Sequence, residues 1–405
     1  MQILLIHQNF PGQFRRLAQA WVRRPDWRIL GLGRATAPGL DGVQWVRYNL
    51  HRVGHKAQHP YLRKMEDAVL HGQAVARSLL DLKRKGFSPD VVLAHPGWGE
   101  TLFVKDVFPD ARLIHFCEWY YGKSNSDLGF DPEFPITFDA KARLRTWNAL
   151  HSLNLTLCDV GVSPTQWQRS QHPEIFHPKI HLAHEGVDVE LLKPDDRAQL
   201  RLPNGSVLKA GDPVVTYVAR NLEPYRGFHS FMRMLEKVQR VHSQCHAIIV
   251  GGDGVSYGCI PPDAPNWREK MLEEVKGLDL ARTHFLGAVP YNVYRQVLQI
   301  SAAHVYLTYP FVLSWSMLEA MASGCLMIGS RTGPVEEVIR HGENGLLVDF
   351  FNTEEMADNV VEALVSQRAM QTLRSQARVT IQDRYTHDMG EMHYRQLLTE
   401  EILCL

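Results

Sequence analysis

The chain has 405 residues, of which 45% are hydrophobic and 22% charged, and its net charge at pH 7 is zero. That composition is typical of a soluble globular protein, and the length favours two domains over a single core. No apolar run reaches the roughly 18 residues that a membrane helix needs, and the six cysteines form no Cys-x-x-Cys pair. We therefore expect reduced thiols, a cytoplasmic location and no zinc site.

The first half of the chain alternates short apolar runs with amphipathic segments, which is the pattern of βα units around a parallel sheet. Its start, MQILLIHQNF, has neither the basic segment nor the cleavage site of a signal peptide, so we expect a strand there. Residues 66–86 have helical spacing and end on Lys and Arg followed by Gly, a common helix end. The strands expected in this half are 2–7, 28–33, 90–95, 111–116 and 159–163.

The second half restarts the pattern after a segment rich in Pro, Asp and Gly, and we place a linker near 190–210. The strands expected here are 213–220, 246–252, 283–287, 304–309, 326–330 and 345–350. The sequence thus predicts an α/β protein with two Rossmann-like, doubly wound domains facing across a cleft, over 1–195 and 196–385. We expect a C-terminal helix over 386–405 to pack back on the first domain.

Charge is unevenly distributed along the chain. Residues 1–80 carry 12 Lys and Arg against 4 Asp and Glu, a net charge of +8. One interpretation is ordinary solvated surface. The other is a basic face that meets an anionic membrane or an anionic acceptor.

The loop after the strand expected at 213–220 offers two cations to an anion. Arg220 ends that strand, Arg226 follows six residues later, and Gly227 precedes a helical pattern. A guanidinium is a planar fork that matches phosphate oxygens, and a helix start adds N–H groups, so the loop favours a diphosphate site. The alternative is that each arginine makes a surface ion pair.

The stretch FVLSWSMLEAMASG, residues 311–324, places Ser314, Trp315 and Ser316 at the start of a helix, with Glu319 about one turn further on. Backbone N–H groups at a helix start suit an anion. The carboxylate of Glu319 suits the two hydroxyls of a ribose, and its alternative role is that of a capping or buried structural acid.

Strand ends in the first half carry one glycine turn and several polar and aromatic side chains. Gly12, in HQNFPGQF, is a weak sign of close phosphate approach, and its loop lacks the Gly-x-Gly-x-x-Gly fingerprint of dinucleotide enzymes. Aromatic faces with flanking carboxylates are a common sugar-binding arrangement, and for each histidine the alternative is a structural, hydrogen-bonded role. The residues concerned are His95, Trp98, His115, Glu118 and Trp119.

The second half resembles the retaining family-4 glycosyltransferases of GT-B fold. The segments that carry the resemblance are VARNLEPYRGF, IIVGGDG, HFLGAVPYNVY, WSMLEAMASGCLMIGSRTGPVEEVI and HGENGLLVDF. The first half matches more loosely, through SPDVVLAHPGW, DVGVSPTQW and KIHLAHEGVD. The combination of HQNFPGQFRRLA, HPGWGE and CEWYY resembles a bacterial subgroup of that family.

The resemblance implies roles for particular residues of the second half. The family's diphosphate-binding Arg and Lys fall on Arg220 and Arg226, and its ribose-binding acid, the second of a Glu-x7-Glu pair, falls on Glu319. The first acid of that pair, which contacts the transferred sugar in the family, falls on Phe311. The family's glycine-containing loop falls on Leu313–Ser316.

The activity implied by the resemblance is a retaining hexosyl transfer from a nucleoside-diphosphate sugar to a glycan or glycolipid acceptor, in surface polysaccharide or glycoconjugate synthesis. Arg220 and Arg226 are the expected catalytic groups, with His115 and Glu118, near which the family often places a His that touches sugar or acceptor. No metal or other cofactor is expected, since two arginines neutralise the diphosphate and no Asp-x-Asp motif is present. The alternatives are a sugar-nucleotide-binding protein without turnover, suggested by Phe311, and a nucleotide-sugar 2-epimerase of the same fold.

The expected partners are a nucleotide-sugar donor and a glycan or lipid-linked acceptor, with peripheral contact at the inner face of a membrane and no nucleic acid. The expected donor-binding residues are Gly12, Leu313, Ser314, Trp315, Ser316 and Glu319. The expected acceptor- or sugar-binding residues are His95, Trp98, Trp119 and Phe311.

Overall fold

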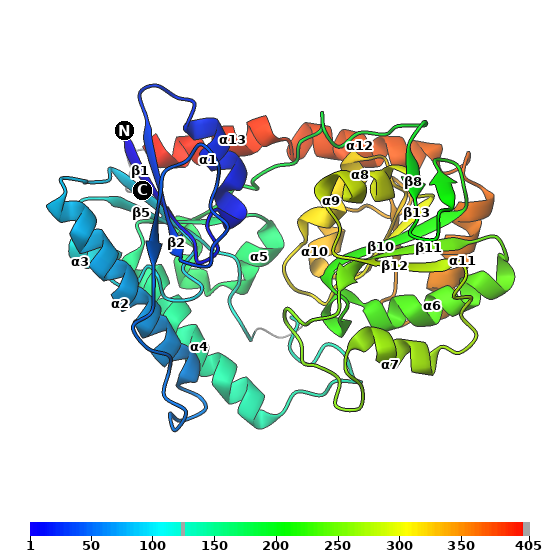
Figure 1. The fold of residues 1–405 in the computed structure, drawn as a ribbon, viewed down its shortest axis with the longest axis horizontal. Coiled ribbons are helices and arrows are strands. Elements are labelled where there is room, and N and C mark those ends of the chain that lie inside the picture. Colours follow the sequence, from blue (N-terminus) through cyan, green and yellow to red (C-terminus); the bar gives the residue numbers. More distant parts are fainter. Residues whose placement is uncertain (123–125, 400–405) are drawn as a thin grey trace. The chain divides into compact units, whose positions relative to one another are not determined.

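A computed structural model of the chain describes residues 1–122 and 126–399, and it contains two compact units (Figure 1). One unit consists of Met1–Gly186 together with the chain from His387 onward, and the other consists of Val187–Thr386. The boundaries predicted from the sequence lay at residues 195 and 385. The predicted C-terminal helix corresponds to α13 (His387–Thr399), and residues 400–405, which it also included, lie outside the described residues.

The first unit is built on a parallel sheet with the strand order β3-β2-β1-β4-β5-β6-β7. Successive side chains of a strand point to opposite faces, so Ile3 and Leu5 of β1 enter one core cluster and Leu4 and Ile6 the other. Helices α1 and α13 cover the first of these faces, and α2 and α3 cover the second (Figure 1). Both faces of the central strands are therefore buried.

The strands of this unit are β1 (Gln2–Ile6), β2 (Arg28–Arg34), β3 (Trp45–Tyr48), β4 (Val91–Ala94), β5 (Arg112–Phe116), β6 (Val160–Ser163) and β7 (Ile180–Leu182). Its helices, besides α13, are α1 (Arg15–Trp21), α2 (Arg63–Arg84), α3 (Val104–Val107), α4 (Phe138–Leu157) and α5 (Gln166–Gln171), with 3-10 turns η1 (Gly12–Phe14) and η2 (Glu174–Lys179). The edge strands β3 and β7 were not predicted. Both are short, and only one residue of each is buried, so they lack the continuous apolar run of a buried parallel strand.

The second unit is built on another parallel sheet, with the order β12-β11-β10-β13-β14-β15. All six strands were predicted, and they are β10 (Val214–Asn221), β11 (His246–Gly252), β12 (Thr283–Gly287), β13 (Ala303–Tyr306), β14 (Met327–Ser330) and β15 (Leu346–Val348). The helices are α6 (Phe228–Val241), α7 (Trp267–Glu274), α8 (Tyr291–Gln299), α9 (Trp315–Ala322), α10 (Gly333–Glu336), α11 (Thr353–Val365) and α12 (Gln371–Arg384), with the 3-10 turn η3 (Pro224–Arg226).

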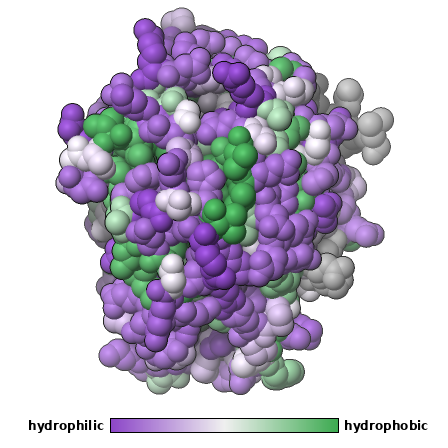
Figure 2. Space-filling view, turned by 90° about the vertical axis from the view of Figure 1, so that its right-hand side faces the viewer, coloured by the Kyte–Doolittle hydropathy of each residue, from purple (hydrophilic) through white to green (hydrophobic). Residues whose placement is uncertain are grey.

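Helices cover both faces of this sheet as well. Side chains of α8, α9 and α12 share one core cluster, whereas Tyr217 of β10 packs against Phe228 and Phe231 of α6 on the opposite face. The face of the second unit that Figure 2 shows is mainly hydrophilic, with separate apolar patches. Among the described helices, none combines the length and the hydrophobicity that crossing a membrane takes.

The structure corrects the predicted linker near 190–210, which lies within the second unit. It contains an antiparallel hairpin of β8 (Gln199–Arg201) and β9 (Val207–Lys209). Leu200 and Leu208 of the hairpin are buried in a cluster with Val214 of β10. Gly205, with a φ of 87°, allows the turn between the strands. The Pro, Asp and Gly residues in this segment thus mark a turn rather than a free connection.

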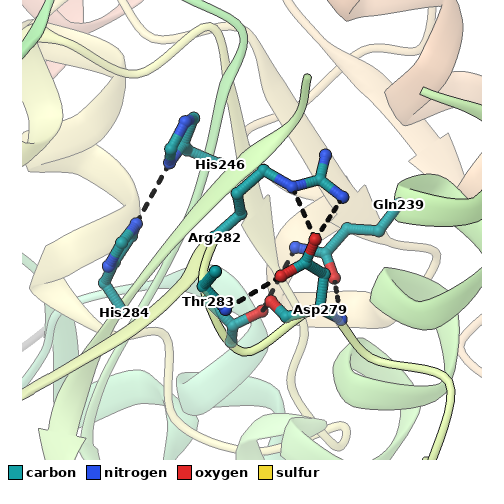
Figure 3. Close-up of polar contacts among 7 residues, drawn as sticks. Gln239, His246, Asp279, Arg282, Thr283 and His284 are labelled. Carbon is teal, nitrogen blue, oxygen red and sulfur yellow. Dashed lines mark hydrogen bonds and ion pairs between the residues drawn. The ribbon is translucent and has the colours of Figure 1, made fainter. Parts of the chain in front are cut away.

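Side-chain bonds occur at the edge strand β12, both in the segment that precedes it and between it and β11 (Figure 3). Arg282 donates from Nε and Nη2 to Oδ2 of Asp279, at 2.9 and 2.7 Å. His246 Nδ1 and His284 Nε2 lie 3.1 Å apart, with the two rings within 8° of parallel. Burial lowers the pKa of both histidines, and this favours a neutral pair joined by one N–H···N bond.

Candidate functional site

A pocket in the second unit opens at the carboxyl ends of β10 and β13. These neighbouring strands lie at the point where the strand order of the sheet reverses, which is where doubly wound sheets bind ligands. The lining of the pocket includes Arg220, Arg226, Ser314 and Ser316, all of which were predicted to bind or activate the donor. The fold therefore brings together residues that lie about ninety positions apart in the sequence.

Arg226, which lines this pocket, is held in place by hydrogen bonds. Its Nη1 donates to Oγ1 of Thr308 and to the carbonyl oxygen of Val312, each at 2.9 Å. Burial opposes the charge of the guanidinium, but the neighbouring hydroxyls of Tyr306 and Tyr257 outweigh it and raise the pKa of Arg226 above its usual value. The side chain is thus a cation whose position is set before any ligand arrives.

Arg220 stands at the end of β10 and is exposed. Its guanidinium makes no hydrogen bond or ion pair with any residue in the described part of the chain, so the surface ion pair considered above is not formed. The lining of the pocket therefore includes one free cation, Arg220, and one fixed cation, Arg226. This arrangement complements an anion with several oxygens, such as a diphosphate.

Glu223 is a residue of the site that the sequence did not reveal. Its carboxylate is 1% exposed and accepts backbone N–H bonds from Ser256 at 3.1 Å, Tyr257 at 3.1 Å and Gly258 at 2.9 Å. It thereby fixes the loop that follows β11 against the loop that follows β10. The available signals were its place between the two arginines in RNLEPYRG and the glycine-rich segment GGDGVSYG after a neighbouring strand.

The predicted anion site at the start of α9 is only partly open. The N–H of Ser314 donates to the Tyr306 hydroxyl at 2.8 Å, and the N–H of Ser316 donates to Oγ of Ser314 at 3.4 Å. The two serine hydroxyls, 3.0 Å apart, line the pocket instead. Trp315 is 39% exposed, whereas Leu313 is 6% exposed and belongs to the hydrophobic core. The structure thus places the Leu313 side chain among packing residues and not in the lining of this pocket.

Glu319 is 7% exposed, on α9. Its Oε1 accepts from the Tyr291 hydroxyl at 3.0 Å and its Oε2 from the Tyr294 hydroxyl at 2.8 Å, both from α8. A carboxylate oxygen can accept more than one hydrogen bond, so a bond from a tyrosine is compatible with a bond from a ribose hydroxyl. Tyr291 and Tyr294 were not predicted, and no motif in the sequence singled them out.

Phe311, which the resemblance places at the position of the family's sugar-contacting acid, is 3% exposed. Its ring makes edge contacts with Tyr257 at 4.9 Å and Tyr225 at 5.5 Å between centroids. Tyr225 in turn packs on Tyr309 at 4.7 Å. Other aromatic rings therefore enclose Phe311, and its contact with a sugar stays a prediction.

A second group of predicted residues meets in the first unit. His95 follows β4 and Glu118 follows β5, and His95 Nε2 lies 3.3 Å from Glu118 Oε2. The Trp98 ring stacks on His95 at 4.4 Å, and Gln13 donates to Glu118 Oε1 at 3.1 Å. Burial acts to raise the pKa of Glu118, but the bond and charge of His95 outweigh it, so the net effect lowers that pKa. The group lies at the point where this sheet reverses its strand order.

Three predicted residues of the first unit are placed differently. His115, on β5, is 1% exposed, and burial lowers its pKa to about 3, so it is a neutral side chain inside the sheet. Trp119 is 5% exposed. Both side chains are buried in the first unit, and their roles toward a substrate stay predictions. Gly12 has a φ of +51°, and a Cβ there would lie 2.4 Å from the His7 ring, so local packing explains this glycine.

Two family models match consecutive parts of the chain. The model described as Glycosyl transferase family 4 group matches residues 25–192, and the model described as Glycosyl transferases group 1 matches residues 200–380. Among curated relatives, D-inositol 3-phosphate glycosyltransferase of Mycobacteroides abscessus is 27% identical over 47% of this chain and 40% of that protein. The protein of that name from Corynebacterium glutamicum is 29% identical over 82% of this chain and 77% of its own length.

The chain spans about two fifths of the length of the first curated relatives that it matches. Solved structures match more completely. Sucrose-phosphate synthase from Thermosynechococcus elongatus aligns over 98% of both chains with a TM-score of 0.71 and 17% identity. The Anabaena protein HepE, in complex with UDP-glucose, aligns over 98% of this chain and 99% of its own with a TM-score of 0.68 and 16% identity. At these identities the likeness shows a shared fold.

These matches define the class of protein. The chain belongs to the family-4 type of glycosyltransferases, and its two Rossmann-like units form the GT-B fold. Both the family and the fold class predicted from the sequence are thereby confirmed.

Proposed function

We propose that this protein transfers a sugar from a nucleoside-diphosphate sugar, with retention of anomeric configuration and without a metal ion. The observation that carries the proposal is the pocket in which the free guanidinium of Arg220 accompanies the fixed guanidinium of Arg226. Two cations and two serine hydroxyls fit the charge and the oxygens of a diphosphate. Family membership and the UDP-glucose complex of HepE support a sugar nucleotide as the molecule that brings this diphosphate.

The proposed reaction breaks the bond between the anomeric carbon and the diphosphate oxygen. A bond from the same carbon to the acceptor oxygen forms on the same face, and the departing phosphate takes the proton of the acceptor hydroxyl. Arg220 and Arg226 stabilise the negative charge that develops on the leaving diphosphate. Because these cations are protein groups, the proposal assigns no step to a metal.

For the acceptor we propose a glycan or a lipid-linked sugar in surface polysaccharide or glycoconjugate synthesis, met at the cytoplasmic face of a membrane. The net charge of +8 in residues 1–80 supports an anionic surface or acceptor as the partner of the first unit. The name of the relative D-inositol 3-phosphate glycosyltransferase supports a second candidate, a small phosphorylated acceptor, which the same charge would attract.

The first test is a thermal-shift panel of the purified protein with UDP-, GDP-, ADP-, dTDP- and CMP-sugars, repeated with Arg220→Ala. We expect one nucleotide class to raise the melting temperature of the wild type and to have a much smaller effect on the variant. If none of the sugar nucleotides stabilises the wild type, the donor-site proposal is wrong.

The second test follows the stabilising sugar nucleotide by NMR in EDTA, with lipid-linked glycans and inositol phosphate as acceptors. We expect a product with the anomeric configuration of the donor. Stabilisation without consumption would indicate a binding protein instead. Conversion of the sugar at C2 without any acceptor would indicate the epimerase alternative.

A further inference from the structure

The pocket in the second unit has an aromatic side, formed by Tyr257. This side chain lines the pocket and is 41% exposed, whereas Phe311 behind it is 3% exposed. The two rings are in edge contact at 4.9 Å. A ligand that approaches this side therefore touches Tyr257, and Phe311, at the position of the family's sugar-contacting acid, stays covered.

Tyr257 is held from two further directions. Its backbone N–H donates to Oε2 of Glu223 at 3.1 Å, and Glu223 also fixes the neighbouring residues of the loop. The guanidinium carbon of Arg226 lies 5.4 Å from the centre of the Tyr257 ring, a cation–π contact. The ring thus stands next to the cation that would hold the diphosphate, which is where the sugar attached to that diphosphate would begin.

We propose that Tyr257 forms the wall on which the donor sugar rests, so that an aromatic face takes the place of the family's carboxylate. The inference rests on the proposed function of this pocket. A carboxylate would accept hydrogen bonds from sugar hydroxyls, whereas a ring packs against the C–H face of a pyranose. Sites that hydrogen-bond a hydroxyl reject analogues without it strongly, and apolar walls discriminate far less. The donor sugar therefore presents a C–H face on this side, and deoxy analogues are tolerated.

The test compares the affinities of a nucleoside diphosphate and its sugar form by calorimetry, with UDP and UDP-glucose, GDP and GDP-mannose, ADP and ADP-glucose, and dTDP and dTDP-glucose as probes. For the pair that the wild type binds, we expect Tyr257→Ala to weaken the sugar form about tenfold relative to the diphosphate. Tyr257→Phe keeps the ring and should stay within about threefold of the wild type. Phe351→Ala, at a residue that is 44% exposed in the same unit, is the control.

A second variant tests how the wall is positioned. Glu223→Gln replaces one of the two carboxylate oxygens that accept N–H groups from the loop. We expect it, like Tyr257→Ala, to lower the ratio of the affinity for the sugar nucleotide to the affinity for the nucleoside diphosphate. Its control is Glu236→Gln, because Glu236 accepts the N–H of Gly277 at 2.7 Å in another loop of this unit. If both variants lower the melting temperature equally but only Glu223→Gln lowers the affinity ratio, Glu223 acts by positioning Tyr257 and not through stability alone.

The outcomes are distinguishable. Wild-type protein that binds none of the probes overturns the proposed function, and the inference falls with it. Binding with a ratio that Tyr257→Ala leaves unchanged overturns the inference alone. A loss in Tyr257→Phe as large as that in Tyr257→Ala also overturns it, because the contact would then run through the hydroxyl and not through the ring.

Discussion

At the scale of single residues, the two arginines of the pocket differ in the hydrogen bonds that they make within the folded protein. Arg226 is bonded to Thr308 and Val312 before any ligand is present, whereas Arg220 is exposed and without a partner among the described residues. Removal of the Arg226 side chain leaves buried acceptors without their hydrogen-bond donor. Removal of the Arg220 side chain leaves no acceptor without a donor among the described residues. The two substitutions should therefore separate stability from binding.

We expect Arg220→Ala to leave the melting temperature of the free protein unchanged. The affinity for the donor diphosphate should fall roughly 10- to 100-fold, which corresponds to the loss of one charge-assisted hydrogen bond. Arg226→Ala should weaken the donor as well and also lower the unfolding free energy by about 1–3 kcal/mol. Calorimetry and chemical denaturation measure the two effects. Arg340→Ala, at a side chain that is 74% exposed in the same unit, should change neither. An unaltered donor affinity in Arg220→Ala would contradict the diphosphate site.

Glu319 is a buried acid whose role the choice of ligand can reveal. If its oxygens bind the ribose, the wild type should prefer a ribonucleoside diphosphate to its 2′,3′-dideoxy analogue, and Glu319→Gln should remove most of that preference. Tyr294→Phe removes the hydroxyl bonded at 2.8 Å and should cost about 1 kcal/mol of stability while keeping the preference. A preference that survives in Glu319→Gln would assign the acid to the tyrosine network alone.

At the scale of elements, two segments of the first unit form a basic–apolar patch, made of the loop at residues 51–62 and the first turns of α2 and α4. Lys64 lies 4.9 Å from the centre of the Trp147 ring, and Tyr61 is hydrogen-bonded to Asp139, so the segments are neighbours. Val53 is 80% and Phe138 is 81% exposed. The exposed basic side chains are Arg52, Lys56, Arg63, Lys64, Lys141, Arg143 and Arg145.

Such a patch is suited to the surface of an anionic membrane, where each basic residue contributes about 1 kcal/mol. We expect the protein to sediment with vesicles that contain anionic lipid at low salt, and not with neutral vesicles. The double variant Lys141→Glu/Arg143→Glu should weaken this binding at least tenfold. Lys193→Glu/Arg197→Glu, with side chains 57% and 95% exposed in the other unit, is the matched control. Equal losses in both pairs would indicate a general charge effect instead of this patch.

At the scale of the whole molecule, stability should depend on buried histidines in both units. Burial lowers the pKa of His115, His151, His184 and His304 to about 3, against about 6.5 in an unfolded chain. Below pH 6.5 these histidines therefore bind protons in the unfolded state, whereas in the folded state they stay neutral. The stabilising effect of their neutral form is complete above pH 6.5 and is lost as the pH falls from there towards 3.

We expect the unfolding free energy to fall by several kcal/mol between pH 7 and pH 5, which is on the order of 1.4 kcal/mol per pH unit for each such histidine. Urea denaturation at a series of pH values measures this slope. Thr216 Oγ1 lies 2.8 Å from Nδ1 of His304, and His304→Asn retains a hydrogen-bond partner for it. This variant should lower the slope of unfolding free energy against pH by the contribution of one proton. His51→Asn, at an exposed side chain, should leave it unchanged. A stability that is constant from pH 7 to pH 5 would contradict the burial argument.

The sequence by itself determined the alternation of strands and helices, the two doubly wound units and the cationic strand end at Arg220. These features depend on local periodicity and on the residues next to a strand, which can be read along the chain. The predicted linker was wrong because the same Pro, Asp and Gly residues occur in tight turns and in free connections.

The tertiary structure decided which of the polar residues meet. Strand order places the ends of β10 and β13 side by side, so Arg220 and Arg226 share a pocket with Ser314 and Ser316, and no local pattern specifies that order. Burial is likewise a property of the packed sheet, which is why His115 proved enclosed and Phe311 covered. Glu223 and Tyr257 became functional candidates for the same reason, since their importance lies in contacts between loops that only folding brings together.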